Sequence, residues 1–381
     1  MTTDGPVKRG RIVELDFIRG IAILMVMGRH FYLPLVPYPL LNAIRDRFWL
    51  SGRSGVDLFF VLSGFLVGGL LLKEYAETGA IQPGRFLLRR GMKIWPAYYV
   101  MLLFHVVVRR HPLSTFLVAN LLHLQNYMGT SIVPTWTLSI EEHFYLFLAF
   151  LLAWAARKRM QANSLLGLLG GLCVAAAGSR MVTLYVMKNR DGALMWTHNR
   201  LDSLMFGVIV AVVYHLKPEL FERIASRTAA LAALSVAGVC WLLLVPDQSA
   251  LMLGPGFTVL YVCFSALLIL AYRHSAGIRN IAPYRWVAWL GVYSYNLYLW
   301  NTVVRPPVEK ITHHFPVPLQ WPAALFLQTA AAAILAVIMT RLVEWPVLRW
   351  RDRKFGASRG IRNTADADTR IPEPVMVETG V

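Results

Sequence analysis

Residues 15–30 read LDFIRGIAILMVMGRH, an apolar segment that carries Asp16, Arg19 and His30 where a membrane helix normally has no ionisable side chain. Charges inside a bilayer are costly, so they mark functional sites by default. Apolar runs of about 20 residues, the length that crosses a bilayer, recur from one end of the chain to the other. We therefore expect an all-α, polytopic integral membrane protein whose first helix carries part of a site.

The composition supports this class. Of the 381 residues, 56% are hydrophobic and 15% are charged, and the mean hydropathy of +0.50 is above that of soluble domains. The net charge of +17 comes from Lys and Arg in the connections between apolar runs, as the positive-inside rule predicts. There is no basic region with interleaved aromatics, so we expect no nucleic-acid partner. The three cysteines and the absence of an HExxH motif predict no metal site.

Hydropathy and charge together predict about ten transmembrane helices with both termini in the cytosol, because the basic residues alternate between richer and poorer connections. The expected spans are 12–33, 54–73, 94–108, 136–155, 165–186, 201–216, 229–246, 255–272, 286–304 and 321–343. The short apolar stretch 113–124 is either an interfacial or re-entrant helix or an eleventh span. Residues 1–350 form one membrane domain, and we expect 351–381 to be a flexible cytosolic tail.

The charged residues of the first helix predict an elongated site that runs along the helix axis. Arg19 and His30 are eleven residues apart, about three turns at ~3.6 residues per turn, so they share a face and lie roughly 16 Å apart along the axis. Asp16, three residues before Arg19, is placed to hold the guanidinium. This layout suits an elongated anionic ligand that enters from the cytosolic side, near Arg19, and ends at His30. Alternatively, His30 is an interfacial residue and Arg19 extends to the lipid headgroups.

Residues 55–65, GVDLFFVLSGF, place Asp57 at the start of the second span, at the expected level of His30. A carboxylate there would orient the imidazole, which must be neutral to act as a base. Asp57 is equally explained as an acid at a helix N-terminus, where the helix dipole stabilises it.

Two further polar clusters flank apolar spans. In residues 89–99, RRGMKIWPAYY, Arg90 and Lys93 are three apart and share a helix face, so they can bind a phosphate-bearing cofactor, although the positive-inside rule explains one or two of these charges. Residues 134–145, PTWTLSIEEHFY, open a long span with two acids and a histidine, which suits a proton relay or hydrogen bonding to a sugar.

These four stretches, in this order, resemble the membrane acyltransferase type 3 family, and the resemblance covers residues 12 to about 350. The R-x10-H signature is met by Arg19 and His30, the R-x-x-R type motif by Arg90 and Lys93, and the W-S-L-S-V-E-E-Q-F-Y pattern by residues 136–145. Residues 200–207, 294–300 and 344–346 resemble later landmarks. The chain departs from the family at His143, Lys93 and Asn301, where glutamine, arginine and histidine are usual.

The resemblance implies a bacterial enzyme of the cytoplasmic membrane that moves an acyl group, most often acetyl, from acyl-CoA to a hydroxyl of a glycan or macrolide-like acceptor. The chain resembles the stand-alone members of the family, which have no extracytoplasmic esterase-like domain. His30 would be the general base, with a covalent acyl-imidazole as a variant. The implied sites are these: catalytic, His30, Arg19, Asp57 and Glu142; acyl-CoA-binding, Arg19, Arg89, Arg90 and Lys93; acceptor-binding, Trp136, Ser139, Glu141 and Tyr145.

No permanently bound cofactor is implied, because acetyl-CoA is a substrate. The alternative function is a secondary transporter of an anionic or sugar-like solute that uses the same intramembrane charges. The first half of the sequence is not repeated in the second, which makes a transporter less favoured.

Overall fold

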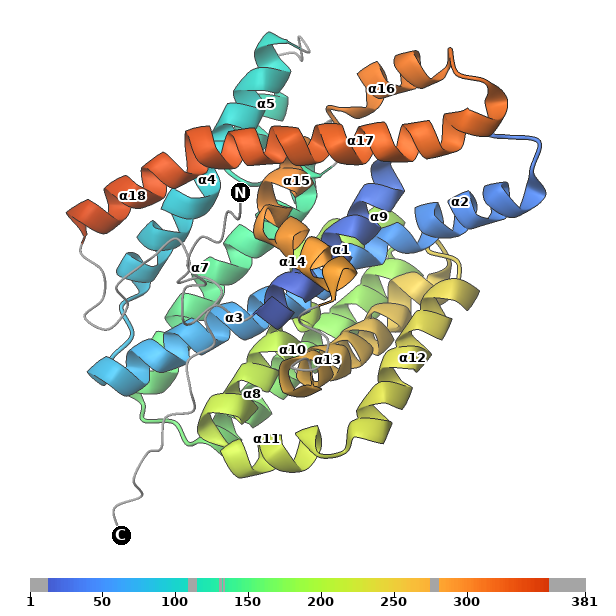
Figure 1. Ribbon diagram of the computed structural model, residues 1–381. Coiled ribbons are helices and arrows are strands. Elements are labelled where there is room, and N and C mark those ends of the chain that lie inside the picture. Colours follow the sequence, from blue (N-terminus) through green and yellow to red (C-terminus); the bar gives the residue numbers. More distant parts are fainter. Residues whose placement is uncertain (1–12, 109–114, 130–131, 133, 275–280, 356–381) are drawn as a thin grey trace.

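The computed structural model describes residues 13–108, 115–129, 132, 134–274 and 281–355, and every regular element in these ranges is a helix (Figure 1). The elements of the first half are α1 Val13–His30, α2 Pro39–Ser51, η1 Gly52–Ser54, α3 Gly55–Thr78, α4 Pro83–Val107, α5 Thr115–Leu121, α6 Gln125–Met128, α7 Thr135–Arg157, α8 Ala162–Met181 and η2 Val182–Val186. The second half contains α9 Arg190–Met195, α10 Thr197–Leu216, α11 Pro218–Ala225, α12 Thr228–Leu244, η3 Met252–Gly256, α13 Phe257–His274, α14 Ala282–Val292, α15 Ser294–Trp300, α16 Arg305–Thr312, α17 Val317–Met339, η5 Thr340–Glu344 and α18 Trp345–Lys354.

Six helical segments among the described residues are long and apolar enough to cross a membrane. They contain α3, α7, α8, α10, α13 and α17, and a seventh is obtained if α11 and α12, which meet at a bend of 72°, count as one span. The protein is therefore a multi-pass membrane protein. The predicted spans 12–33, 94–108 and 286–304 correspond to the charged helix α1, the basic helix α4 and the pair α14 and α15, none of which meets the same criterion.

Helix α1 lies in the middle of the bundle, against α14 on one side and α3 on another (Figure 1). The contact with α14 is close because glycines line it: a side-chain carbon on Gly20 would overlap the carbonyl of Val287, and one on Gly291 would overlap that of Asp16. Gly64 and Gly207 bring α3 and α10 together in the same way. Small residues at membrane helix contacts allow such approach, and here they fix α1, which carries Arg19 and His30, inside the protein.

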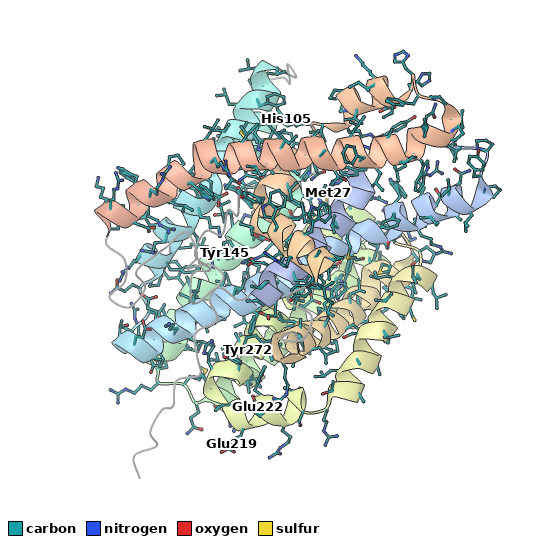
Figure 2. The ribbon with its side chains drawn as sticks, in the orientation of Figure 1. Met27, His105, Tyr145, Glu219, Glu222 and Tyr272 are labelled. Carbon is teal, nitrogen blue, oxygen red and sulfur yellow. The ribbon has the colours of Figure 1, made fainter. Side chains whose placement is uncertain are left out.

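In this bundle, several aromatic side chains lie in the interior and several charged side chains project at the edge. Tyr145 and Tyr272 lie among the helices, whereas Glu219 and Glu222 project from α11 at the edge of the molecule (Figure 2). The hydrophobic core runs through α1, α3, α7, α10 and α13 as one contiguous cluster.

The structure differs most from the expected boundaries in three places. Helix α4 begins at Pro83 rather than near residue 94, because a proline suits the first turn of a helix, so the basic cluster lies within the helix. The span 286–304 is divided at Tyr293 into α14 and α15. Residues 351–354, expected in the tail, belong to α18, which continues to Lys354 with Arg351 buried. Residues 356–381 lie outside the described ranges.

The stretch 113–124 contains α5, which at seven residues is too short to span a bilayer. Residues 113 and 114, at its start, lie outside the described ranges. An eleventh span at this place is therefore not supported.

Candidate functional site

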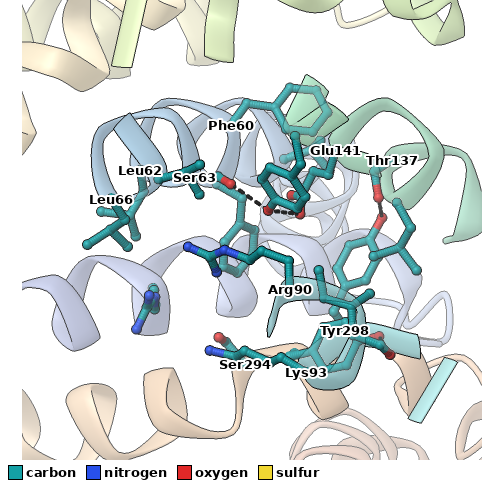
Figure 3. A pocket seen from close by; sticks show the side chains of 18 of the residues that line it. Phe60, Leu62, Ser63, Leu66, Arg90, Lys93, Thr137, Glu141, Ser294 and Tyr298 are labelled. Atoms are coloured by element: carbon teal, nitrogen blue, oxygen red, sulfur yellow. Dashed lines mark hydrogen bonds between the residues drawn. The ribbon is translucent and has the colours of Figure 1, made fainter. Parts of the chain in front are cut away.

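A large cavity lies where α1, α3, α4, α7, α14 and α15 meet, and we call it the Arg90 cavity (Figure 3). Its empty volume is about 990 Å³ including its open mouth. Three cations and two acids are among the residues that line it: Arg19, Arg90, Lys93, Glu141 and Glu344. Arg19 and the pair Arg90 and Lys93, predicted from separate motifs, are thus brought into one cavity.

Arg90 reaches from α4 towards a polar cluster on α3 and α7 (Figure 3). Its guanidinium carbon lies 5.5 Å from the centre of the Tyr145 ring, a cation-π arrangement. The hydroxyl of Tyr145 donates a hydrogen bond of 2.8 Å to Glu141 and is also bonded to Ser63, at 2.8 Å. The sequence did not indicate Ser63 as part of the site, because a serine inside an apolar helix carries no signal of its own.

Arg19 is held as its spacing predicted, with its Nη1 3.4 Å from the carboxylate of Asp16. Asp16 is buried, whereas Arg19 is partly exposed to the cavity that it lines. One end of α1 therefore presents a cation to the Arg90 cavity.

Arg89 is placed apart from its neighbour. It is not among the residues that line the Arg90 cavity, and its Nη2 lies 3.8 Å from the carboxylate of Asp352 on α18. Successive residues on a helix point in different directions, so Arg89 and Arg90 face different surroundings. The structure gives Arg89 an ion pair with the C-terminal helix in place of the expected position beside the other cations.

A second cavity, which we call the His30 cavity, lies at the other end of α1 and has an empty volume of about 700 Å³. Its lining includes Arg29, His30, Arg53, Trp136 and Asp191. Neither Arg19 nor Arg90 is among its lining residues, and His30 is not among those of the Arg90 cavity. The two ends of the first helix therefore face two separate spaces.

The hydrogen-bond partner of His30 is Asn301, the residue that caps the C-terminus of α15. His30 Nδ1 lies 2.8 Å from Asn301 Oδ1. The amide nitrogen of Asn301 donates to the carbonyls of Leu297 and Tyr298, at 3.0 and 2.8 Å, so its oxygen is the atom that faces the histidine. The hydrogen bond then requires a proton on Nδ1, which leaves Nε2 without a proton as a base. The sequence indicated Asn301 only as a departure from a family pattern.

The expectation that Asp57 orients His30 is wrong. Asp57 instead forms an ion pair with Arg200 of α10, and both side chains are buried. A buried carboxylate needs a cation or several hydrogen bonds. Arg200, which is 143 residues further along the chain, supplies the cation and donates a hydrogen bond to Asp57. Asp57 lines neither of the two cavities, although its neighbour Val56 lines both.

The residues expected to bind the acceptor are divided between the two cavities. Trp136, in the first turn of α7, lines the His30 cavity. Glu141 and Tyr145 lie further along the same helix and line the Arg90 cavity. Ser139 is buried and lines neither cavity. Glu142, on the same helix but expected as a catalytic residue, also lines neither cavity and accepts a hydrogen bond of 3.1 Å from the indole of Trp95. The residues of this motif therefore line two cavities along one helix and do not form a single site.

Sequence reasoning missed an ion-pair cluster of three charged residues, two of which line the His30 cavity. Arg29 and Arg53 approach the same buried carboxylate, that of Asp247, at 3.4 and 3.7 Å. Both arginines line the His30 cavity, and Arg29 also stacks on Trp49 at 3.5 Å. Asp247 comes from a connection with no basic residue, so only the fold reveals that this acid balances two cations.

Comparison with known proteins identifies the family of this chain. The chain matches the family described as an acyltransferase domain over residues 12–341. It is 28% identical to the peptidoglycan O-acetyltransferase OatA of Listeria monocytogenes, over 89% of this chain and 56% of that protein. It is 27% identical to the putative peptidoglycan O-acetyltransferase YrhL of Bacillus subtilis, over 90% of this chain and 56% of that protein.

A putative O-acetyltransferase of Staphylococcus aureus is 25% identical over 89% of this chain and 59% of its own length. The chain thus spans a little over half the length of these relatives. No solved structure matches it significantly. Because the family match covers most of the sequence, the chain belongs to the acyltransferase domain family.

Proposed function

We propose that the protein is a membrane O-acetyltransferase that moves the acetyl group of acetyl-CoA to a hydroxyl of a cell-surface glycan, with His30 as the general base. The observation that carries this proposal is the arrangement along α1: a cation-lined cavity at Arg19 and a histidine with a fixed tautomer in a separate cavity at the other end. Family membership supports acyl transfer rather than solute transport.

The proposed topology has ten crossings, with both termini in the cytosol of a bacterial cell and α1, α4 and the pair α14 and α15 counted as spans. The excess of Lys and Arg on one set of connections supports this orientation. Helices that carry charges or a break are tolerated in a membrane where they line a cavity or are buried in protein. Arg19 then lies towards the cytosol and His30 towards the outside.

The donor would bind in the Arg90 cavity. Phosphates pair well with guanidinium and ammonium groups, and Arg19, Arg90 and Lys93 supply these from two helices. Glu141 and Tyr145, which line the same cavity, are assigned here to the donor side, where they position Arg90. This leaves Trp136, beside His30, as the member of its motif that would contact the acceptor.

In the proposed reaction, His30 Nε2 removes the proton of the acceptor hydroxyl as that oxygen attacks the acetyl carbonyl carbon. The tetrahedral intermediate collapses with cleavage of the carbon–sulfur bond. The sulfur of coenzyme A leaves with the bonding electrons and takes the proton from the imidazolium, so the base is restored. Asn301 would stabilise the imidazolium in its position, much as an asparagine does in Cys-His-Asn sites.

The acceptor is proposed to be a glycan, because two of the relatives are named for peptidoglycan. Arg29 and Arg53 give the His30 cavity cations, and Asp191 and Gln248 also line it. Such a mixed polar lining with an indole suits an oxygen-rich sugar.

The proposal is tested with inverted membrane vesicles that are given acetyl-CoA labelled in the acetyl group. Wild-type vesicles should transfer label to the glycan fraction, and His30→Ala should reduce the rate by ~10²–10⁴-fold, the usual contribution of a general base. His313→Ala is the matched control, because this exposed histidine lies at the end of α16. Transfer that survives His30→Ala would remove the histidine from the mechanism, and uptake of a labelled sugar without transfer would favour a transporter.

A further inference from the structure

The Arg90 cavity and the His30 cavity share two lining residues, Val56 of α3 and Tyr298 of α15. Both side chains are largely buried. Since Arg19 lines only the first cavity and His30 only the second, a group that is bound at one end of α1 and reacts at the other has to pass between them. Val56 and Tyr298 are the described residues that line both cavities, so they lie where such a group would have to pass.

Tyr298 is held firmly at this place (Figure 3). Its hydroxyl donates a hydrogen bond of 2.8 Å to the carbonyl of Pro134 and lies 2.6 Å from the hydroxyl of Thr137. Both partners are at the start of α7, so the tyrosine connects α15 to that helix across the boundary between the cavities. The ring of Phe59 packs against Tyr298 edge to face, with centroids 6.4 Å apart, so the side chain is fixed at both its hydroxyl and its ring.

Tyr298 is also coupled to the base. The backbone carbonyl of Tyr298 accepts a hydrogen bond of 2.8 Å from the amide of Asn301, the residue that holds His30. The passage and the reactive histidine are therefore positioned by the same short segment after the break at Tyr293. A displacement of the ring does not require a displacement of that carbonyl, because the two belong to the side chain and the backbone.

We propose that Tyr298 and Val56 form a constriction through which the acyl group passes to His30, and that this constriction sets the length of the acyl chain that the protein transfers. The inference rests on the proposed function, because it takes acyl-CoA as the donor. An acetyl group has only a methyl beyond its carbonyl, so it requires less space at the constriction than longer acyl chains do. Each added methylene has to displace the Tyr298 ring and its two hydrogen bonds to α7.

The test measures initial rates of acyl transfer with acetyl-CoA, butyryl-CoA and hexanoyl-CoA, each labelled in the acyl group, in wild-type and variant vesicles. The wild type should prefer acetyl. Tyr298→Ala should raise the ratio of butyryl to acetyl transfer by about 10-fold or more, since a pocket wall discriminates added methylenes by roughly 10-fold to 200-fold. Tyr298→Phe keeps the ring but removes its two hydrogen bonds to α7, so it should shift the ratio in the same direction by a smaller factor than Tyr298→Ala.

Two further variants keep the result interpretable. Val56→Ala opens the other side of the constriction and should shift the ratio in the same direction by a smaller factor. This variant replaces Tyr298→Ala in the test if Tyr298→Ala does not accumulate in the membrane. Tyr261→Ala is the matched control, because Tyr261 is a buried tyrosine of α13 outside the described lining of either cavity. Its ratio should equal that of wild type.

The outcomes separate the two proposals. If wild-type vesicles transfer acetyl but Tyr298→Ala and Val56→Ala keep the wild-type ratio, the constriction is refuted and the proposed function stands. A shift in Tyr261→Ala as large as in Tyr298→Ala would also refute it, because the effect would then come from loosened packing. If wild-type vesicles transfer no acyl group from any of the three donors, both proposals fail.

Discussion

Two groups of charged side chains inside this protein have opposite surroundings. The closed group joins α3, α8 and α10 and consists of Arg180, Asp202, Arg200 and Asp57, which are all buried and line neither cavity. The cavity group consists of Arg19, Arg90, Lys93 and Glu141, which line the Arg90 cavity. Both groups combine basic with acidic side chains, so the sign of the charges alone does not reveal which of them serve the structure and which serve the site.

The charges of the closed group are paired with one another within the protein. Arg180 donates from Nη1 to Asp202 at 2.6 Å, from Nε to the carbonyl of Gly254 at 3.0 Å and from Nη2 to Thr258 at 3.0 Å. Arg200 pairs with Asp57 and stacks on Phe257 at 3.5 Å. Charges that are paired and hydrogen-bonded in this way fix the packing of helices, whereas charges that face a cavity remain accessible to a ligand.

The comparison predicts that breaking the closed group costs stability, and this is the largest effect expected. Asp57→Ala leaves Arg200 buried without its carboxylate, which should cost about 3–5 kcal/mol. The measurement is the thermal unfolding of the purified protein in detergent. The double variant Asp57→Leu with Arg200→Met removes both charges and should recover most of the loss. If Asp57→Ala unfolds like wild type but has lost acetyl transfer, Asp57 belongs to the site after all.

A change at Asn301 should have the opposite character, with loss of activity and little loss of stability. Asn301→Leu removes the acceptor that keeps the proton on His30 Nδ1, so transfer from acetyl-CoA should fall by about 100-fold, part of the usual contribution of a base. Asn301→Asp keeps an oxygen at that position and should retain more activity than the leucine variant. Equal activities of the two variants would show that the tautomer of His30 does not depend on this contact.

Within the cavity group, Arg90 should act on donor binding. Arg90→Gln removes a charged hydrogen-bond donor, so KM for acetyl-CoA should rise by roughly 10-fold to 100-fold with a smaller change in kcat. Arg85→Gln is the matched control, because Arg85 lies on the same helix but is exposed and outside the cavity lining. A rise in KM of the same size in both variants would attribute the effect to the general charge of α4.

The smallest effect is expected from the hydroxyl of Tyr145. Tyr145→Phe removes the hydrogen bonds to Glu141 and Ser63 while keeping the ring near Arg90. A typical hydrogen bond contributes about 0.5–1.5 kcal/mol, so KM for acetyl-CoA should rise by roughly 2-fold to 10-fold. Tyr145→Leu, which also removes the ring, should have a larger effect. The opposite order of the two variants would contradict the cation-π role.

Several features of the site could be predicted because they depend on local spacing. The pairing of Asp16 with Arg19 follows from three residues on one helix, and the shared cavity of Arg90 and Lys93 follows from the same periodicity. Helix existence was predicted at each of the ten apolar runs, because hydropathy and length are local properties. Boundaries were less accurate, as α4 and the break at Tyr293 show.

Contacts between helices were not predictable in the same way. Asp57 was expected beside His30 because both were placed at one level of the membrane, yet which helix face meets which is decided by packing. Arg200 reaches Asp57 and Asn301 reaches His30 across long separations in the chain. In each case the structure replaces a plausible neighbour with a different one.

The sequence alone thus specified a helical membrane protein with Arg19 and His30 on one helix, because apolar runs and helical periodicity are written in neighbouring residues. The tertiary structure alone decided that these two side chains face different cavities, that Asn301 orients the histidine and that Tyr298 lies at the boundary. The physical reason is that a helix presents several faces, and its partners are selected by the close approach of glycine-lined surfaces such as that between α1 and α14.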